Sequence, residues 1–228
     1  MKEQNRLSTI RTGKGDLGIS EVVSGYKIRK DSYICSLQNE LQFLRNNIYE
    51  YKLSLEDEIF IHSNKIDPYK EIFNQNNEFN YIKKQFEILD VICLYVINTI
   101  SASAYYKFEK NKFMVYPSFI EKINKELENL KQEHIECPEF FIPSLKISLL
   151  GDNVTTEIRK VETHFWSAVF EIYNQYDKQM FKHEDNEIVN NIAKFLNMLS
   201  DYMFLYNRYV HFTFSDETYY WKNEKSVS

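Results

Sequence analysis

The feature that most constrains this sequence is a helical period of apolar residues that returns in five segments. Their spacings alternate between three and four, so within each segment they fall on one stripe of a helix. Spacings that average about 3.5 residues favour near-parallel helix packing, as in up-and-down bundles. We therefore predict an all-α fold, a five-helix up-and-down bundle. Its helices are expected around residues 34–51, 79–100, 117–130, 147–172 and 188–210.

Some of these segments also carry aromatic residues beside the main stripe. Trp166, Phe170 and Phe204 are examples. A second apolar face indicates subunit contacts or a large ligand, and additional core is an equally good interpretation of the period alone.

The rest of the chain is predicted to be irregular. A length of 228 residues with 43% hydrophobic content is enough for one core, and 5 Gly and 4 Pro are too few for a turn-rich sandwich or barrel. We expect a single domain over 1–228, with an irregular ligand-binding arm (1–32), a helical bundle (33–214) and a frayed polar tail (215–228).

Charge and hydropathy exclude several classes of protein. The net charge is −5 and there is no basic stripe, which argues against a nucleic-acid partner. Residues 88–100 are too short for a membrane span and contain Asp90 and Asn98, and residues 1–8 lack the apolar core of a signal peptide. The 3 Cys are far apart, without a CxxC pair. We expect a cytoplasmic protein with reduced thiols and no membrane partner.

The sequence supports neither a dinucleotide-binding fold nor a di-iron site. The residues from Gly13 to Gly18 match GxGxxG, but no predicted parallel sheet surrounds them. A glycine-rich loop can still surround phosphates with its backbone N–H groups, and a flexible arm is the alternative. None of the 5 His has a Glu three residues before it, so a di-iron site is excluded and no protein metal ligand is predicted.

Polar residues interrupt the last two predicted helices. Asn197, Asp201 and Arg208 have spacings of four and seven, which places them on one face. In the preceding helix, Arg159, Lys160, Glu162 and Thr163 also break the apolar pattern. An interhelical salt-bridge network and a ligand site both fit these residues.

The same residues carry a family resemblance. The run from Phe195 to Phe204, FLNMLSDYMF, is similar to the LNRLSDYLF signature of PduO-type ATP:cob(I)alamin adenosyltransferases. Residues 140–148 resemble the family's FILPSGGKIS, 159–163 lie where RRAER is expected, 11–13 resemble TRTGDxG, and 27–31 contain an RxxKD-like run. The motifs occur in family order over nearly the whole chain.

The resemblance implies a function in vitamin B12 metabolism. It implies a homotrimeric helical bundle with active sites between subunits, which transfers the 5′-deoxyadenosyl group of ATP to cob(I)alamin and releases triphosphate. Mg²⁺ would be bound by the phosphates of ATP, and a reductase is a possible partner. The implied catalytic residues are Phe140, an apolar wedge on the lower corrin face, and Arg159. Phe140 and Asp201 would contact cobalamin. The implied ATP-binding residues are Arg11, Thr12, Gly13, Ser20, Lys30, Arg159, Lys160, Glu162, Thr163 and Asn197.

Two departures from the family pattern leave a second function open. Asn39 replaces an Asp of DELN that pairs with the first arginine of RRAER, and Thr163 replaces the last arginine of RRAER. The first change removes a charge-assisted hydrogen bond, and the second removes a cation from the triphosphate site. A non-catalytic paralogue that binds cobalamin or ATP as a carrier or sensor is therefore the alternative.

Overall fold

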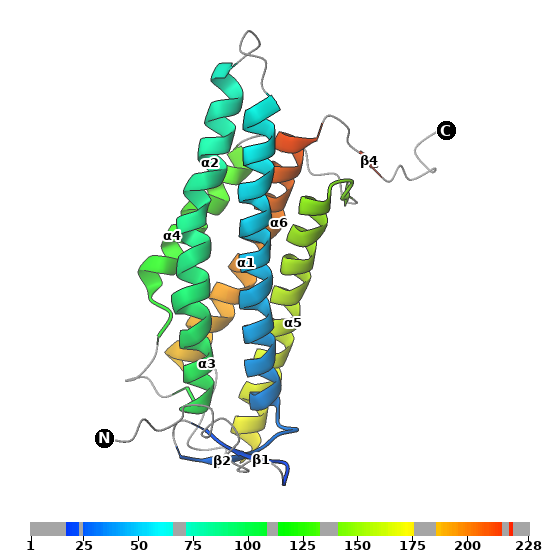
Figure 1. Cartoon of the computed structure of the whole chain (residues 1–228). Coiled ribbons are helices and arrows are strands. Elements are labelled where there is room, and N and C mark those ends of the chain that lie inside the picture. Colours follow the sequence, from blue (N-terminus) through cyan, green and yellow to red (C-terminus); the bar gives the residue numbers. More distant parts are fainter. Residues whose placement is uncertain are drawn as a thin grey trace, which may run out of the picture.

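The protein is a bundle of long helices arranged side by side (Figure 1). The structure is a computed structural model that describes residues 17–22, 25–65, 72–108, 114–132, 141–175, 186–215 and 219–220. Its helices are α1 (Tyr33–Lys65), α2 (Ile72–Val91), α3 (Ile97–Tyr105), α4 (Pro117–Gln132), α5 (Lys146–Gln175) and α6 (Glu187–Phe214). A π-helical turn, η2 (Ile92–Val96), joins α2 directly to α3. The predicted five-helix, all-α bundle is confirmed, with α2, η2 and α3 forming one continuous rod.

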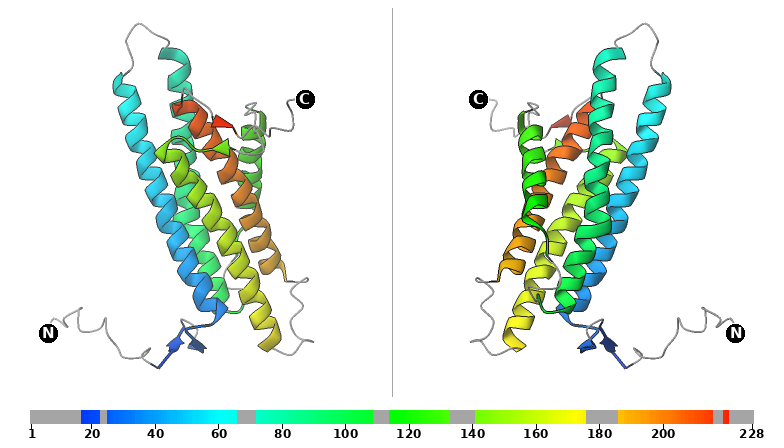
Figure 2. Two further views of the ribbon diagram at one scale, coloured as in Figure 1. Left: turned by 90° about the vertical axis from the view of Figure 1, so that its right-hand side faces the viewer. Right: turned by 90° about the vertical axis from the view of Figure 1, so that its left-hand side faces the viewer.

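The apolar stripes meet in one continuous core. Leu37, Leu44 and Ile48 of α1 are fully buried with Val161 and Phe165 of α5. The side views show α1, α5 and α6 running along most of the length of the bundle (Figure 2). The cluster is extended by buried tyrosines, of which Tyr202 and Tyr206 stack with their ring centroids 5.8 Å apart.

The rod formed by α2, η2 and α3 is the most hydrophobic part of the chain. Its section Asn77–Tyr105 has a window of mean hydropathy 1.6, which by length and composition is enough to cross a membrane. Within that window 56% is buried inside the protein, and Gln85 is fully buried, where its Oε1 accepts a 2.9 Å hydrogen bond from Tyr202. A core helix of a bundle has these properties, so this section gives little support to a membrane span.

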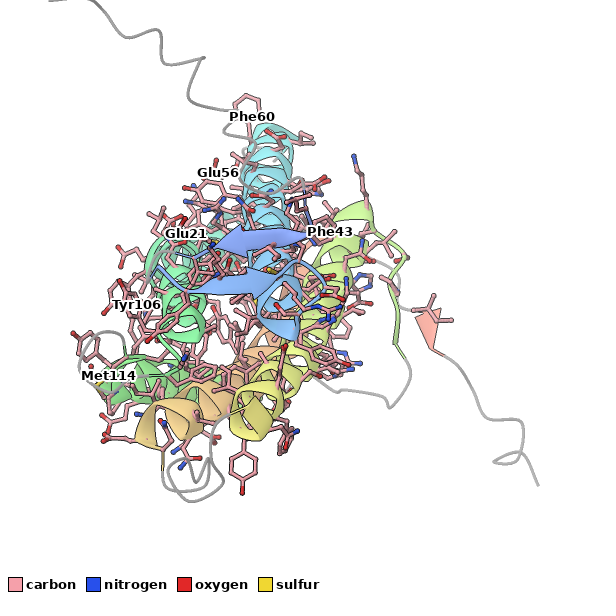
Figure 3. The ribbon with its side chains drawn as sticks, turned by 90° about the horizontal axis from the view of Figure 1, so that it is seen from below. Glu21, Phe43, Glu56, Phe60, Tyr106 and Met114 are labelled. Carbon is pink, nitrogen blue, oxygen red and sulfur yellow. The ribbon has the colours of Figure 1, made fainter. Side chains whose placement is uncertain are left out.

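Two short antiparallel sheets lie outside the prediction. Strands β1 (Ile19–Glu21) and β2 (Lys27–Arg29) form a hairpin in the region predicted to be irregular. Its turn is closed by the Gly25 N–H, which donates to the Val22 carbonyl at 2.8 Å, and Gly25 has φ 79°, a conformation that favours glycine. Seen from below, the hairpin lies across the end of the bundle (Figure 3).

The second sheet corrects the expectation of a frayed tail. Strand β3 (Phe141–Ile142) pairs with β4 (Tyr219–Tyr220), so part of the segment after α6 is attached to the start of α5. These strands are two residues long, too short for an alternating pattern to identify them in a sequence.

Candidate functional site

The candidate site lies where α5 and α6 pack antiparallel. Three side-chain contacts fix their register: Ser148 Oγ with His211 Nδ1 at 2.9 Å, Asn207 Nδ2 with Asp152 Oδ1 at 2.9 Å, and Arg159 Nε with Ser200 Oγ at 3.2 Å. The last contact places Arg159 one helical turn from Asn197. Both Arg159 and Asn197 are exposed, so they face outward from the bundle.

We call the polar residues at this level the α5/α6 polar surface, in which Glu162 is half-buried and the others are exposed. It consists of Arg159, Glu162, Thr163, Asn197 and Asp201. Partial burial raises the pKa of Glu162, the neighbouring Asp201 carboxylate raises it further, and Arg159 opposes the shift. The guanidinium of Arg159 therefore lies within electrostatic reach of Glu162, which itself is close to Asp201. The sequence analysis grouped these residues, and the structure brings them together.

Lys160 points into a different environment. Its ammonium is 2.6 Å from Glu40 Oε2 on α1 and 3.4 Å from Glu157 Oε1. Burial raises the pKa of Glu157, and a hydrogen bond shared with Glu40 adds to the rise. Burial also acts to raise the pKa of Glu40, but hydrogen bonds from Glu157 and Lys160 outweigh it and the net direction is down. Lys160 is therefore paired with Glu40 across the α1/α5 contact and with Glu157 on its own helix.

Arg208 does not share the environment of Asn197 and Asp201, although the spacing predicted one face. It is 4% exposed, with its guanidinium carbon 3.6 Å from the ring centroid of Phe204. Asn197 and Asp201 are exposed. One stripe along the 28 residues of α6 is exposed to solvent in one part and buried by neighbouring helices in another. The spacing of residues in the sequence does not show where the buried part begins. Arg208 therefore lies inside the bundle, where its charge acts on Asp152.

The buried polar network joins three helices near the first turns of α5. Asn207 is its centre: its Nδ2 donates to the Ser148 carbonyl at 2.8 Å and to Asp152, and its Oδ1 accepts from Tyr51 Oη at 3.1 Å. Burial raises the pKa of Asp152, while the hydrogen bond from Asn207 and the charges of Arg208 and Arg159 lower it. Gly151 makes room for this amide, because a Cβ there would be 2.0 Å from Asn207 Oδ1.

The amino-terminal arm is described in part. Ser20 pairs with Ile28 across the hairpin, and the Lys30 N–H donates to the Gly18 carbonyl at 2.9 Å, with the Lys30 side chain exposed. Arg11, Thr12, Gly13 and the wedge residue Phe140 lie outside the described residues. Nothing in the structure therefore bears on their predicted roles.

The hairpin meets α5 near its carboxyl end. A hollow of about 680 Å³ there is lined by residues of the hairpin, the start of α1 and the last turns of α5: Arg29, Asp31, Ser32, Tyr33, Ser167, Phe170, Glu171 and Asn174. The Tyr33 N–H donates to Glu171 Oε2 at 2.8 Å, which fastens α1 to α5. At about 1.5 Å per residue, Arg159 lies roughly 12 Å along α5 from Ser167 and roughly 22 Å from Asn174, the first and last α5 residues that line the hollow. Lys30, between Arg29 and Asp31 of this hollow, therefore lies at a different level of the bundle from Arg159.

Asn39 also lies apart from Arg159. It lines a polar groove of about 240 Å³ between α1 and the α2–α3 rod, together with Gln38, Gln42 and Arg45. The Arg159 side chain donates to Ser200 instead, so within one chain Asn39 does not pair with Arg159 as the family aspartate would.

Comparison with known proteins gives a fold. No family model matches the sequence, and no curated protein matches it. Two solved structures of variants of PduO-type ATP:corrinoid adenosyltransferase from Lactobacillus reuteri, complexed with cobalamin and ATP, match with TM-scores of 0.59 and 0.60 and identities of 15% and 14%. Each match covers 94% of this chain, with 99% and 97% of the other chain. The chain has the fold of these adenosyltransferases.

A third match agrees with the first two. An arginine-to-lysine variant of the same Lactobacillus reuteri enzyme, complexed with ATP, has a TM-score of 0.56, 15% identity, and coverage of 90% of this chain and 94% of that chain. The adenosyltransferase fold therefore extends over the whole bundle, while the low identity leaves the individual site residues to be judged on their own contacts.

Two partners of the adenosyltransferase-like motifs were not predicted from the sequence. Ser200 holds Arg159, and Glu40 holds Lys160. A serine three residues after Asn197 inside an amphipathic helix was a signal for the first. The second pairing joins residues far apart in the chain and has no local signal. Among the residues that the structure describes, no cluster of three His, Cys, Asp or Glu could hold a metal ion.

Proposed function

We propose that this chain transfers the 5′-deoxyadenosyl group of ATP to cob(I)alamin, giving adenosylcobalamin and triphosphate. The observation that carries the proposal is the α5/α6 polar surface, where Arg159 and Asn197 lie together on a bundle with the adenosyltransferase fold. Polar donors on an exposed helix face, next to a cation, suit the ribose and phosphate groups of a nucleotide.

The proposed roles of the chain's own residues follow from charge and exposure. Arg159 would bind a phosphate oxygen of ATP, and Asn197 would hydrogen-bond the ribose or a phosphate. Lys30 and the arm would enclose the triphosphate, and Asp201 would contact cobalamin. Mg²⁺ would arrive with the phosphates of ATP.

We further propose that each active site forms between neighbouring subunits of a homotrimer. The support is that Lys30 and Arg159 lie at different levels of one chain. Apolar side chains are also exposed along α1, where Phe43, Leu53 and Phe60 are 53%, 55% and 70% exposed. Phe43 and Phe60 are labelled in Figure 3. A second subunit that covers this face would bury them and bring its own Arg159 to the arm.

The first experiment is anaerobic incubation with chemically reduced cobalamin and Mg-ATP, followed by detection of light-sensitive adenosylcobalamin. We expect product from the wild-type chain and a strong loss with Asn197→Ala. The matched control is Asn80→Ala, at an exposed asparagine of α2 far from the polar surface in the sequence. Binding of ATP and cobalamin without product would contradict the transferase proposal.

A complementation experiment tests the shared site. Lys30→Ala and Arg159→Ala are each expected to be inactive, and oligomers that contain both variants are expected to regain part of the activity. Recovery requires that the two residues act from different subunits. No recovery in demonstrably mixed oligomers would contradict a site between subunits.

The second candidate is a carrier or sensor that binds cobalamin or ATP without turnover. The observation that favours it is the engagement of Lys160 by Glu40 and Glu157, because it leaves fewer cations to balance a departing triphosphate. The same incubation separates the two candidates, since a carrier would bind both ligands and form no adenosylcobalamin.

A further inference from the structure

The side chain of Arg159 forms a hydrogen bond with a buried serine. Its Nε donates to Ser200 Oγ at 3.2 Å, and Ser200 is 5% exposed whereas Arg159 is exposed. A guanidinium has one N–H at Nε and four at its two terminal nitrogens. The bond to Ser200 occupies the inner N–H and leaves the four terminal N–H groups for other acceptors.

Arg159 is also the cation in segment 159–163 that lies outside the ion pairs with Glu40 on α1 and Glu157 on α5. The segment lies wholly within the described part of the chain. Lys160 is paired with Glu40 and Glu157, and Thr163 donates its hydroxyl to the Arg159 carbonyl at 3.0 Å. The orientation of one side chain therefore determines how much positive charge this stretch of α5 presents to a ligand.

Two carboxylates compete for that side chain. Burial raises the pKa of both Glu162 and Asp152, and the charge of Arg159 opposes each rise, so both carboxyl groups lie within its electrostatic reach. A long side chain without an anchor would be drawn onto one of them, and an arginine paired with a carboxylate offers fewer donors to an anion.

We propose that Ser200 is a positioning residue, which orients Arg159 so that its terminal nitrogens face an anionic group of the bound nucleotide. The inference deepens the proposed function and rests on it for the identity of the nucleotide. Ser200 itself does not touch the ligand. It acts by fixing Nε and by keeping the guanidinium away from Glu162 and Asp152.

The first test needs no nucleotide. Exchange of the Arg159 Nε–H with solvent is measured by ¹⁵N NMR on the full chain, with the signal assigned by its loss in Arg159→Lys. We expect faster exchange in Ser200→Ala than in the wild type. The matched control is Ser148→Ala, which removes another buried α5/α6 contact, to His211, and is expected to leave Arg159 unchanged.

The second test measures ATP affinity by calorimetry. We expect Ser200→Ala to weaken ATP binding about fivefold, the net contribution of one hydrogen bond, and Ser148→Ala to leave it unchanged. In the Arg159→Ala background, Ser200→Ala should have no further effect, because the serine acts through the arginine.

The outcomes separate the inference from the proposed function. Equal Nε–H exchange in wild type and Ser200→Ala would overturn the inference whatever the ligand. Faster exchange with unchanged ATP affinity, in a chain whose Arg159→Ala variant does lose affinity, would also overturn it. A wild-type chain that does not bind ATP would refute the proposed function and with it the positioning role, even where the exchange result shows the hydrogen bond.

Discussion

The helices α5 and α6 present polar side chains in two contrasting settings. Near the first turns of α5, Tyr51, Asp152 and Asn207 satisfy one another in the buried polar network. Two turns further along, Arg159 and Asn197 are exposed, and the Arg159 side chain donates to Ser200. In the buried polar network the hydrogen-bonding groups face the interior of the protein, whereas on the α5/α6 polar surface they face solvent.

The difference shows what a polar residue on an apolar helix indicates. Where a third helix covers the pair, as α1 does through Tyr51, the polar groups must find partners inside the protein and they stabilise the packing. Where no such cover exists, the same residue types remain available to a ligand or another subunit. Substitutions in the buried polar network are therefore expected to lower the free energy of unfolding. Substitutions on the α5/α6 polar surface are expected to lower ligand affinity.

The largest effect is expected at Gly151. In Gly151→Ala the new Cβ would be 2.0 Å from Asn207 Oδ1, so the amide must move and its hydrogen bonds to Tyr51 and Asp152 break or distort. We expect a loss of about 3 kcal/mol in the free energy of unfolding, measured by denaturant titration.

The double variant Gly151→Ala, Asn207→Ala tests the cause of that loss. If the clash with the amide is responsible, the double variant will lose less stability than the two single variants added together. Strict additivity would show that Gly151 matters for another reason, such as the backbone freedom of glycine.

At the polar surface, Arg159→Ala should change binding and leave stability nearly intact. We expect ATP affinity to fall by about 2 kcal/mol, the range for a hydrogen-bonded charged group, with the free energy of unfolding changed by less than about 0.5 kcal/mol. Calorimetric titration with Mg-ATP and a denaturant curve give both numbers. A large loss of stability with unchanged affinity would place Arg159 with the buried network instead.

A smaller effect is expected from Tyr51→Phe. The change removes the hydroxyl that donates to Asn207 Oδ1 in a fully buried position, and we expect a loss of about 1 kcal/mol in the free energy of unfolding. Tyr49→Phe, at an exposed tyrosine of the same helix, is the control and should be nearly neutral. Equal effects would mean that the Asn207 contact contributes little.

The sequence predicted the helices well because their apolar stripes repeat over many turns, and it placed Arg159 and Asn197 together through motif order. It could not separate Arg208 from Asn197, because spacing gives the face of a helix and not the neighbour that covers it. The pairing of Lys160 with Glu40 depends on how α1 meets α5. The hairpin around Gly25 was missed because strands of three residues show no clear alternation.

The subtlest test uses the pH dependence of stability at Asp152. Because burial raises its pKa in the folded state above the unfolded value, ionisation of Asp152 opposes folding. This penalty is absent at pH values below the ordinary aspartate pKa of about 4, grows as the pH rises toward the folded pKa, and is complete above it. Asp152→Asn keeps an acceptor for Asn207 and removes the charge.

We therefore expect Asp152→Asn to be more stable than the wild type at pH 7, by about 1 kcal/mol or less, with the difference shrinking as the pH falls toward 4. Denaturant curves across this range give the comparison. Asp201→Asn is the control at the exposed end of the same helix pair, and its stability difference should be small. A variant at position 152 that loses stability at pH 7 would show that the charges of Arg159 and Arg208 outweigh burial, and the network would then depend on an ion pair.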